Sequence, residues 1–130
     1  MDTVEVKPLL APELLESIAA KVMEEKQVIV HCCFASDFQF GNLIRIWRST
    51  YLIDRESGHR SALVHAENIT FFPFWTEVPA VKDYWFTLVF TGLPSDCKNF
   101  DLKEEIPQEG GFYVQNIARN NSDIYRIKIS

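Results

Sequence analysis

The chain has 130 residues, of which 47% are hydrophobic and 13% aromatic, and this size and composition predict one folded globular domain. Its formal net charge of −5 argues against a nucleic-acid-binding protein, because phosphates are bound through an excess of lysine and arginine. No apolar run is long enough for a membrane span, and residues 1–5 lack the features of a signal peptide. With an odd number of cysteines, three, we expect a cytoplasmic protein with reduced thiols, exported only if a leader has been removed.

One helix is predicted, in the first part of the chain. Pro12 suits the first turn of a helix, and apolar residues recur at helical spacing from Leu14 to Met23, with glutamates on the rest of the wheel. This pattern predicts an amphipathic helix over residues 12–26. We expect its apolar stripe to lie on a sheet of the same chain, and the alternative is a docking helix for a partner.

The remaining chain predicts about seven strands separated by turns. The strand over residues 43–53 and the one over 61–67 are expected to form a hairpin, and so are the last two strands. The Phe-Phe-Pro-Phe-Trp segment at residues 71–75, the aromatic connector, cannot be a central strand because Pro73 lacks an N–H. Strands are predicted at residues 27–35, 43–53, 61–67, 83–91, 98–102, 112–118 and 124–129.

The clearest of these strands is the one over residues 83–91. Tyr84, Phe86, Leu88 and Phe90 share one face, and the other face is mostly β-branched or aromatic, which is typical of a strand inside a sheet. Short strands at this spacing indicate a sandwich or a barrel. We therefore predict a mainly β protein: a single immunoglobulin-like β-sandwich domain over residues 1–130, with one N-terminal α-helix packed on one side or end.

Two resemblances support a sandwich. Cys33, Trp47 and Cys97 stand in the order, and at about the spacing, of the B-strand cysteine, C-strand tryptophan and F-strand cysteine of immunoglobulin domains, which the chain resembles in this respect. The tyrosine expected two residues before the second cysteine is Ser95 here, so the resemblance implies architecture only. No disulfide between Cys33 and Cys97 is predicted.

The second resemblance covers residues 28–129. The chain resembles a small β-sandwich pattern of uncharacterised Bacteroidetes proteins, which implies a bacterial origin and the same fold but no catalytic residue and no function. Members of that group are often exported, and the missing leader departs from them. The matching segments are Trp47–Asp54, Ser57-Gly58, His65–Ile69, Phe86–Phe90, Leu93-Pro94 and Phe100–Glu104.

Catalytic and metal-binding signatures are weak. Cys32 and Cys33 are adjacent and point to opposite faces of a strand, unlike the short paired spacing of zinc ligands, so no metal and no cofactor are predicted. Glu104 and Glu105, close to Asp101, are expected to be a solvated surface. The chain has no phosphate-binding loop and no nucleophile elbow. We predict no catalytic residue.

The predicted hairpin carries the first candidate binding surface. If Ile44 and Ile46 point inward, Arg45, Trp47 and Tyr51 point outward. His65 and Glu67 join this outer face if Val64 and Ala66 point in. Arginine with aromatic side chains is typical of recognition surfaces. The alternative is that Trp47 belongs to the core and Arg45 covers it.

The aromatic connector carries the second candidate surface. It either plugs one end of the sandwich or forms an exposed patch, which in a monomer usually marks a binding site. We predict a non-catalytic module that binds a protein partner or forms a homo-oligomer. The alternative is a small enzyme or small-ligand-binding protein with a pocket near His65 and the connector. Candidate binding residues are Arg45, Trp47, Tyr51, His65, Glu67, Phe72, Phe74 and Trp75.

Overall fold

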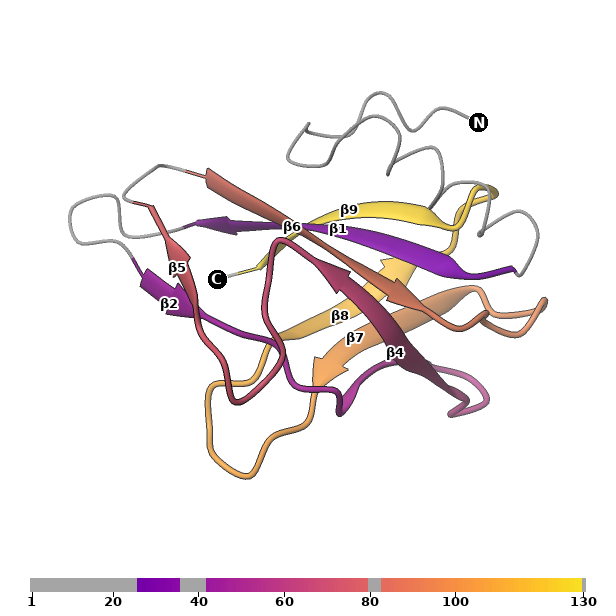
Figure 1. The fold of residues 1–130 in the computed structure, drawn as a ribbon. Coiled ribbons are helices and arrows are strands. Elements are labelled where there is room, and N and C mark those ends of the chain that lie inside the picture. Colours follow the sequence, from indigo (N-terminus) through magenta and orange to yellow (C-terminus); the bar gives the residue numbers. More distant parts are fainter. Residues whose placement is uncertain (1–25, 36–41, 80–82, 130) are drawn as a thin grey trace.

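The computed structural model describes residues 26–35, 42–79 and 83–129, and strands are the only regular elements within these ranges. The helix predicted over residues 12–26 lies outside the described residues, except for Lys26. Within these ranges, no helix is long and apolar enough to cross a bilayer. The nine strands of the described ranges, labelled in Figure 1, are β1 (Val28–Ala35), β2 (Asn42–Ile44), β3 (Thr50–Asp54), β4 (Arg60–Glu67), β5 (Thr76–Val78), β6 (Asp83–Phe90), β7 (Asn99–Glu104), β8 (Tyr113–Ala118) and β9 (Ile124–Ile129).

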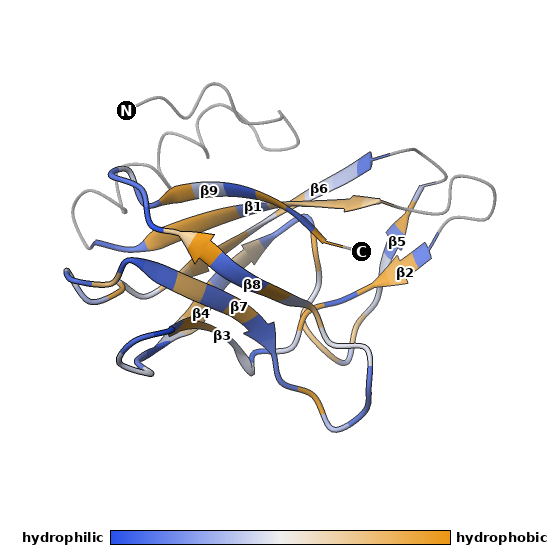
Figure 2. Ribbon diagram, turned by 180° about the vertical axis from the view of Figure 1, so that it is seen from behind, coloured by the Kyte–Doolittle hydropathy of each residue, from blue (hydrophilic) through white to orange (hydrophobic). Residues whose placement is uncertain are grey.

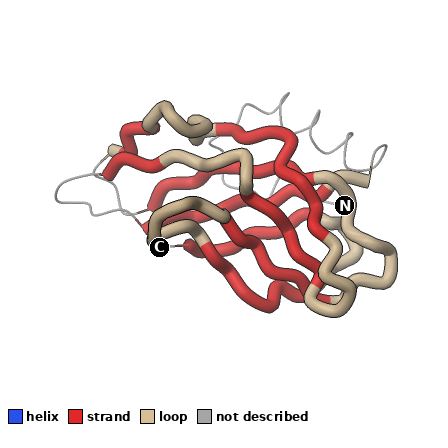
Figure 3. The backbone as a smooth tube through the Cα atoms, turned by 90° about the horizontal axis from the view of Figure 1, so that it is seen from below, coloured by secondary structure: helices blue, strands red, loops and turns tan. Residues whose placement is uncertain are grey.

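Seven strands form one sheet in the order β8-β7-β3-β4-β6-β1-β9, and β2 pairs with β5 in a small second sheet. All pairings in the large sheet are antiparallel except that of β1 with β9. β8 and β9 follow one another in the chain but lie at opposite edges, so the sheet curls until it is nearly closed. In Figure 1, β9, β1 and β6 lie above β8, β7 and β4, and Figure 3 shows most loops gathered at the strand ends. The prediction of a mainly β protein is confirmed.

The final hairpin predicted from residues 112–118 and 124–129 is wrong in its pairing. Both strands exist, but β8 hydrogen-bonds to β7 while β9 runs parallel to β1. The turn between them is fixed by Arg119, whose guanidinium binds the Asp123 carboxylate (Nε–Oδ1 2.6 Å) and donates to the Pro94 carbonyl at 2.7 Å. The turn bridges the two sheet edges because it connects β8 to β9, and Arg119 ties it to the loop after β6.

Tyr125 of β9 packs across the interior of the curled sheet. Its ring meets the ring of Phe100 on β7, with centroids 5.0 Å apart, although four strands separate β9 from β7 in the sheet order. Its hydroxyl donates to the Asp123 carboxylate at 2.9 Å and accepts the Asn120 N–H at 3.0 Å. The same side chain therefore joins the interior to the bridging turn.

Replacing Tyr125 with phenylalanine should keep the ring contact and remove both hydrogen bonds. Since a part-buried N–H loses its acceptor, we expect the free energy of unfolding to fall by about 1–2 kcal/mol. Urea unfolding would measure it. Tyr113→Phe is the control, because the Tyr113 hydroxyl bonds only at the exposed surface and its loss should change stability by less than about 0.5 kcal/mol. Equal effects of the two variants would contradict this role of Tyr125.

β6 is an interior strand, as its sequence predicts. It pairs with β4 on one side and β1 on the other. Phe86, Leu88 and Phe90 are 0–1% exposed and belong to the main hydrophobic cluster, and Thr87 and Val89 on the opposite face are also buried. Figure 2 shows two patterns of hydropathy along the strands: β1 is hydrophobic along most of its length, whereas β7 alternates between hydrophobic and hydrophilic residues.

The second face of β1 and β6 contains a buried histidine. His31 is 2% exposed, and its Nδ1 lies 2.8 Å from the Thr87 hydroxyl across the strand pair. Burial, together with the positive charge of Arg126, lowers the pKa of His31 to about 4, so the imidazole is neutral in the folded protein.

Acid should destabilise the protein through His31. Between about pH 6.5 and about pH 4 the unfolded chain binds a proton that the folded chain does not, so this contribution is complete above pH 6.5 and is lost as the pH falls toward 4. From pH 7 to pH 5 we expect a loss of about 2 kcal/mol, measured by urea unfolding. His31→Val should lack this part of the pH dependence. Identical pH dependence in both proteins would show that His31 is not buried in its neutral form.

The predicted strand over residues 43–53 is divided in two. Ile44 and Ile46 point into the core as predicted, but the chain leaves the extended pairing between β2 and β3, and Arg48 is exposed there. The β3–β4 hairpin is confirmed. Val64 does not point inward as expected, since a register shift between Leu63 and His65 leaves Val64 43% exposed.

Candidate functional site

The aromatic connector is held as a fixed loop by backbone and threonine hydrogen bonds. Thr76 Oγ1 accepts the Thr70 N–H at 2.8 Å, and the Thr70 hydroxyl donates to the Phe74 carbonyl at 3.0 Å. The Ile46 N–H donates to the Thr70 carbonyl and the Ile46 carbonyl accepts the Phe72 N–H, both at 2.8 Å. The connector is therefore held against Ile46 by hydrogen bonds within the chain, without a bound partner.

Five side chains on this loop and the neighbouring segment form what we call the aromatic platform: Arg45, Trp47, Phe72, Phe74 and Trp75. The Arg45 guanidinium carbon lies 3.8 Å from the centre of the Trp75 ring and 4.6 Å from that of Phe72. Trp47 stacks on Phe72 with centroids 3.8 Å apart. At this spacing the guanidinium interacts with the ring faces.

The platform faces solvent. Phe72, Phe74 and Trp75 are 44%, 71% and 52% exposed, which is unusual for large aromatic side chains. Of the two alternatives for the connector, the exposed patch describes Phe72, Phe74 and Trp75, whereas Phe71 packs against the main hydrophobic cluster. Trp47 is half-buried and stacks at the surface, so it lies outside the main hydrophobic cluster.

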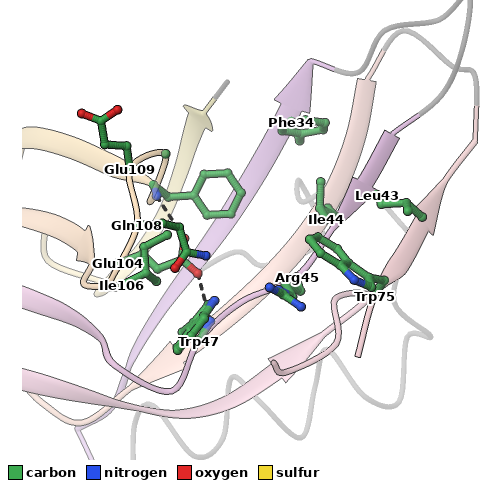
Figure 4. A pocket seen from close by; sticks show the side chains of 12 residues that line it. Phe34, Leu43, Ile44, Arg45, Trp47, Trp75, Glu104, Ile106, Gln108 and Glu109 are labelled. Atoms are coloured by element: carbon green, nitrogen blue, oxygen red, sulfur yellow. Dashed lines mark hydrogen bonds between the residues drawn. The ribbon is translucent and has the colours of Figure 1, made fainter. Parts of the chain in front are cut away.

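A pocket of about 340 Å³ lies beside the platform and opens to solvent (Figure 4). Its walls come from β1, β2, the segment before β3, the connector, the end of β7, and the loop between β7 and β8. The lining residues are Phe34, Leu43, Ile44, Arg45, Trp47, Trp75, Glu104, Ile106, Gln108, Glu109, Gly110 and Phe112.

The pocket contains one buried carboxylate, that of Glu104, which is 7% exposed. Its Oε2 accepts the Trp47 N–H at 2.9 Å and its Oε1 accepts the Phe112 N–H at 3.1 Å, as drawn in Figure 4. Burial raises the pKa of Glu104, while the two N–H groups and the charge of Arg45 oppose this rise. Glu104 thus joins two walls of the pocket and supplies its only deeply buried charge among the described lining residues.

The expectation that Glu104 is solvated is wrong. β7 continues through Glu104, and the alternation of the strand places it on the inward face with Phe100 and Leu102. Extending the predicted strand by two residues would have revealed this position. Glu105 lies near the surface and pairs with Arg60, in line with the expectation for its side chain.

Three predicted site residues lie apart from the platform. His65 and Glu67 form a side-chain pair with each other on β4. Tyr51 on β3 packs under the Arg60 guanidinium, 4.1 Å from the ring centre. None of these three side chains lines the pocket, so the pocket beside the connector is not the one expected near His65.

The cysteines and histidines do not assemble into a chemical site. All three cysteines are buried, with Cys32 in the main cluster and Cys33 on the other face of β1, as adjacent strand residues require. Burial raises the pKa of Cys32 and of Cys97, which makes both thiols poor nucleophiles. Within the described ranges, no three His, Cys, Asp or Glu side chains come together as a metal site would require.

Comparisons of the chain with family models, with curated proteins and with solved structures find no match. The two resemblances seen in the sequence therefore stay predictions.

Removing the Glu104 carboxylate should destabilise the fold, because two backbone N–H groups lose their acceptor. We expect Glu104→Ala to lower the free energy of unfolding by about 2–4 kcal/mol in urea unfolding. Glu105→Ala is the matched control, since it breaks a surface pair that contributes less than about 1 kcal/mol. If the two variants lost the same stability, Glu104 would not be the link between the pocket walls.

Proposed function

We propose that this protein is a non-catalytic interaction module that binds a protein partner through the aromatic platform. The observation that carries this proposal is the exposure of Phe72, Phe74 and Trp75 on a loop that is already hydrogen-bonded in place. Aromatic and arginine side chains supply most of the binding energy at many protein interfaces. Because the loop is fixed in advance, its ordering adds little to the entropic cost of binding.

A second copy of the chain is the other occupant that this proposal allows. The platform would then contact the same platform on a twofold-related copy. Light scattering over a range of protein concentrations separates this case from a monomer that binds a different protein.

The alternative function is binding of a small molecule in the pocket, which at about 340 Å³ is near the lower end of ligand pockets. An enzymatic version would need Glu104 as an acid or a base. Its two oxygens already accept backbone N–H groups that hold the pocket walls, which favours binding over proton transfer.

For the fold, we propose that the curled sheet is an immunoglobulin-like sandwich, as the sequence predicts. The support is the arrangement of β9, β1 and β6 above β8, β7 and β4 (Figure 1). We also propose a cytoplasmic location, on the ground of the odd number of cysteines in the sequence.

The test of the interaction module is Trp75→Ala. Since Trp75 is half-exposed, the variant should keep the wild-type melting temperature within a few degrees and weaken partner capture about tenfold or more. Capture would be measured by affinity purification from a lysate of the source organism, with light scattering for self-association.

Tyr113→Ala is the matched control for capture, because Tyr113 is 51% exposed but neither lines the pocket nor touches Arg45. It should capture the partner as the wild type does. If Trp75→Ala instead lost about 3–5 kcal/mol of stability, as truncation of a buried aromatic residue does, the tryptophan would be a structural residue. The basis of the proposal would then be removed.

A further inference from the structure

We propose that the pocket beside the platform receives a lysine or arginine side chain of the protein partner, with Glu104 as its counter-ion. This inference rests on the proposed function and adds the chemistry of the partner residue. It assigns a separate role to each half of the site: the platform supplies apolar contact, and the pocket selects charge.

The position of the Glu104 carboxylate favours a cation in the pocket. Glu104 lines the pocket yet is only 7% exposed, so a charged group that enters the pocket meets it away from bulk water. Charges attract more strongly in such surroundings than at the surface. The hydrogen bonds from the Trp47 and Phe112 N–H groups hold the carboxylate in one orientation. They occupy one acceptor position on each oxygen, and a carboxylate oxygen has a second.

The wall of the pocket is largely aromatic and apolar. Phe34 and Phe112 meet edge to face with centroids 6.4 Å apart, and Trp47 and Trp75 line the pocket as well. Aromatic faces attract cations, and the aliphatic stem of lysine or arginine packs well on apolar walls such as Leu43. The lining thus fits both parts of a long cationic side chain.

The charged residues that line the pocket are mostly acidic. Glu104 and Glu109 line the pocket, against the single positive charge of Arg45. The Arg45 guanidinium is already engaged, since it lies over the Trp75 and Phe72 rings and donates to the Pro73 carbonyl at 3.2 Å. Glu104, Glu109 and Arg45 together leave one excess negative charge at the pocket, which favours an entering cation over an entering anion. Burial also raises the pKa of Glu104, which a neighbouring cation would relieve.

Arg45 provides an internal precedent for this chemistry. Its guanidinium carbon is 3.8 Å from the centre of the Trp75 ring, and Trp75 also lines the pocket. The protein therefore already holds a guanidinium against this aromatic surface. A partner side chain in the pocket would instead contact the aromatic residues that line it, Phe34, Trp47 and Phe112, with Glu104 as its acceptor.

The test is a titration of the whole chain, followed by the indole N–H resonances of Trp47 and Trp75. The probes are the Nα-acetyl amides of lysine, arginine, norleucine and glutamate. The lysine and arginine probes should shift both resonances saturably. The affinity of the neutral norleucine probe should be lower by about fivefold or more. The glutamate probe should not bind. Equal binding of lysine and norleucine would mean a plain apolar pocket, and no binding by any probe would overturn the inference.

Glu104→Gln keeps the size of the side chain and removes its charge. Its single acceptor oxygen leaves one of the two backbone N–H groups without a partner, so urea unfolding first checks that the variant is folded. Lysine binding should weaken about fivefold or more in this variant. Glu109→Gln is the second variant. Because Glu109 is exposed, its replacement should leave the packing of the core unchanged. It should weaken lysine binding about two- to threefold. Unchanged affinity in either folded variant would contradict the charge argument.

Partner capture separates this inference from the function on which it rests. Loss of the partner in Trp75→Ala but full capture by Glu104→Gln would leave the module standing and remove the cation pocket. Full capture by both variants would remove the interaction module. In that case, lysine binding to the isolated chain would still decide whether the pocket selects cations.

Discussion

The structure depends on one constraint: two strands that follow each other in the chain lie at opposite edges of the same sheet. The turn over residues 119–123 has to span these edges, so the sheet must curl. Curling brings β1 close to the loop after β7, although three strands separate β1 from β7 in the sheet order. The contact between Phe34 and Phe112 exists only because of this closure, and so does the pocket that they line. The Arg119 and Tyr125 contacts that fix the turn therefore also position the candidate site.

Within this frame, the platform and the pocket are linked through one side chain. Glu104 binds the N–H of Trp47, which stacks on the connector, and the N–H of Phe112, which forms the opposite wall. A buried carboxylate is costly unless it is hydrogen-bonded, and here the backbone supplies the compensation. The same arrangement that stabilises the charge leaves it facing a cavity. The site therefore combines a rigid aromatic surface with a charge held in a fixed place.

Alternation along the strands allowed much of the sheet to be predicted, but not its closure. The pattern of Phe86, Leu88 and Phe90 identified β6 as an interior strand, and alternation past Leu102 would have placed Glu104 inside. The turn at residues 119–123 has the composition of a hairpin, and composition does not say which partner each strand takes. The bulge after Leu63 leaves no mark in the residue types either. Accordingly, the aromatic and arginine residues of the platform could be found from the sequence, whereas Phe34 and Phe112 could not.

The parallel pairing of β1 with β9 has a consequence for how the chain reaches its fold. Ile29 pairs with Ile124, so the pairing of the first described strand is complete only when the last one is present. Closing so long a loop is slow, because the entropy of the intervening chain is lost before the contacts are gained. During synthesis, β1 can pair with β6, but one of its edges stays open until residues 124–129 have left the ribosome. An open, hydrophobic strand edge invites pairing with other chains, so the nascent protein is most exposed to aggregation in that interval.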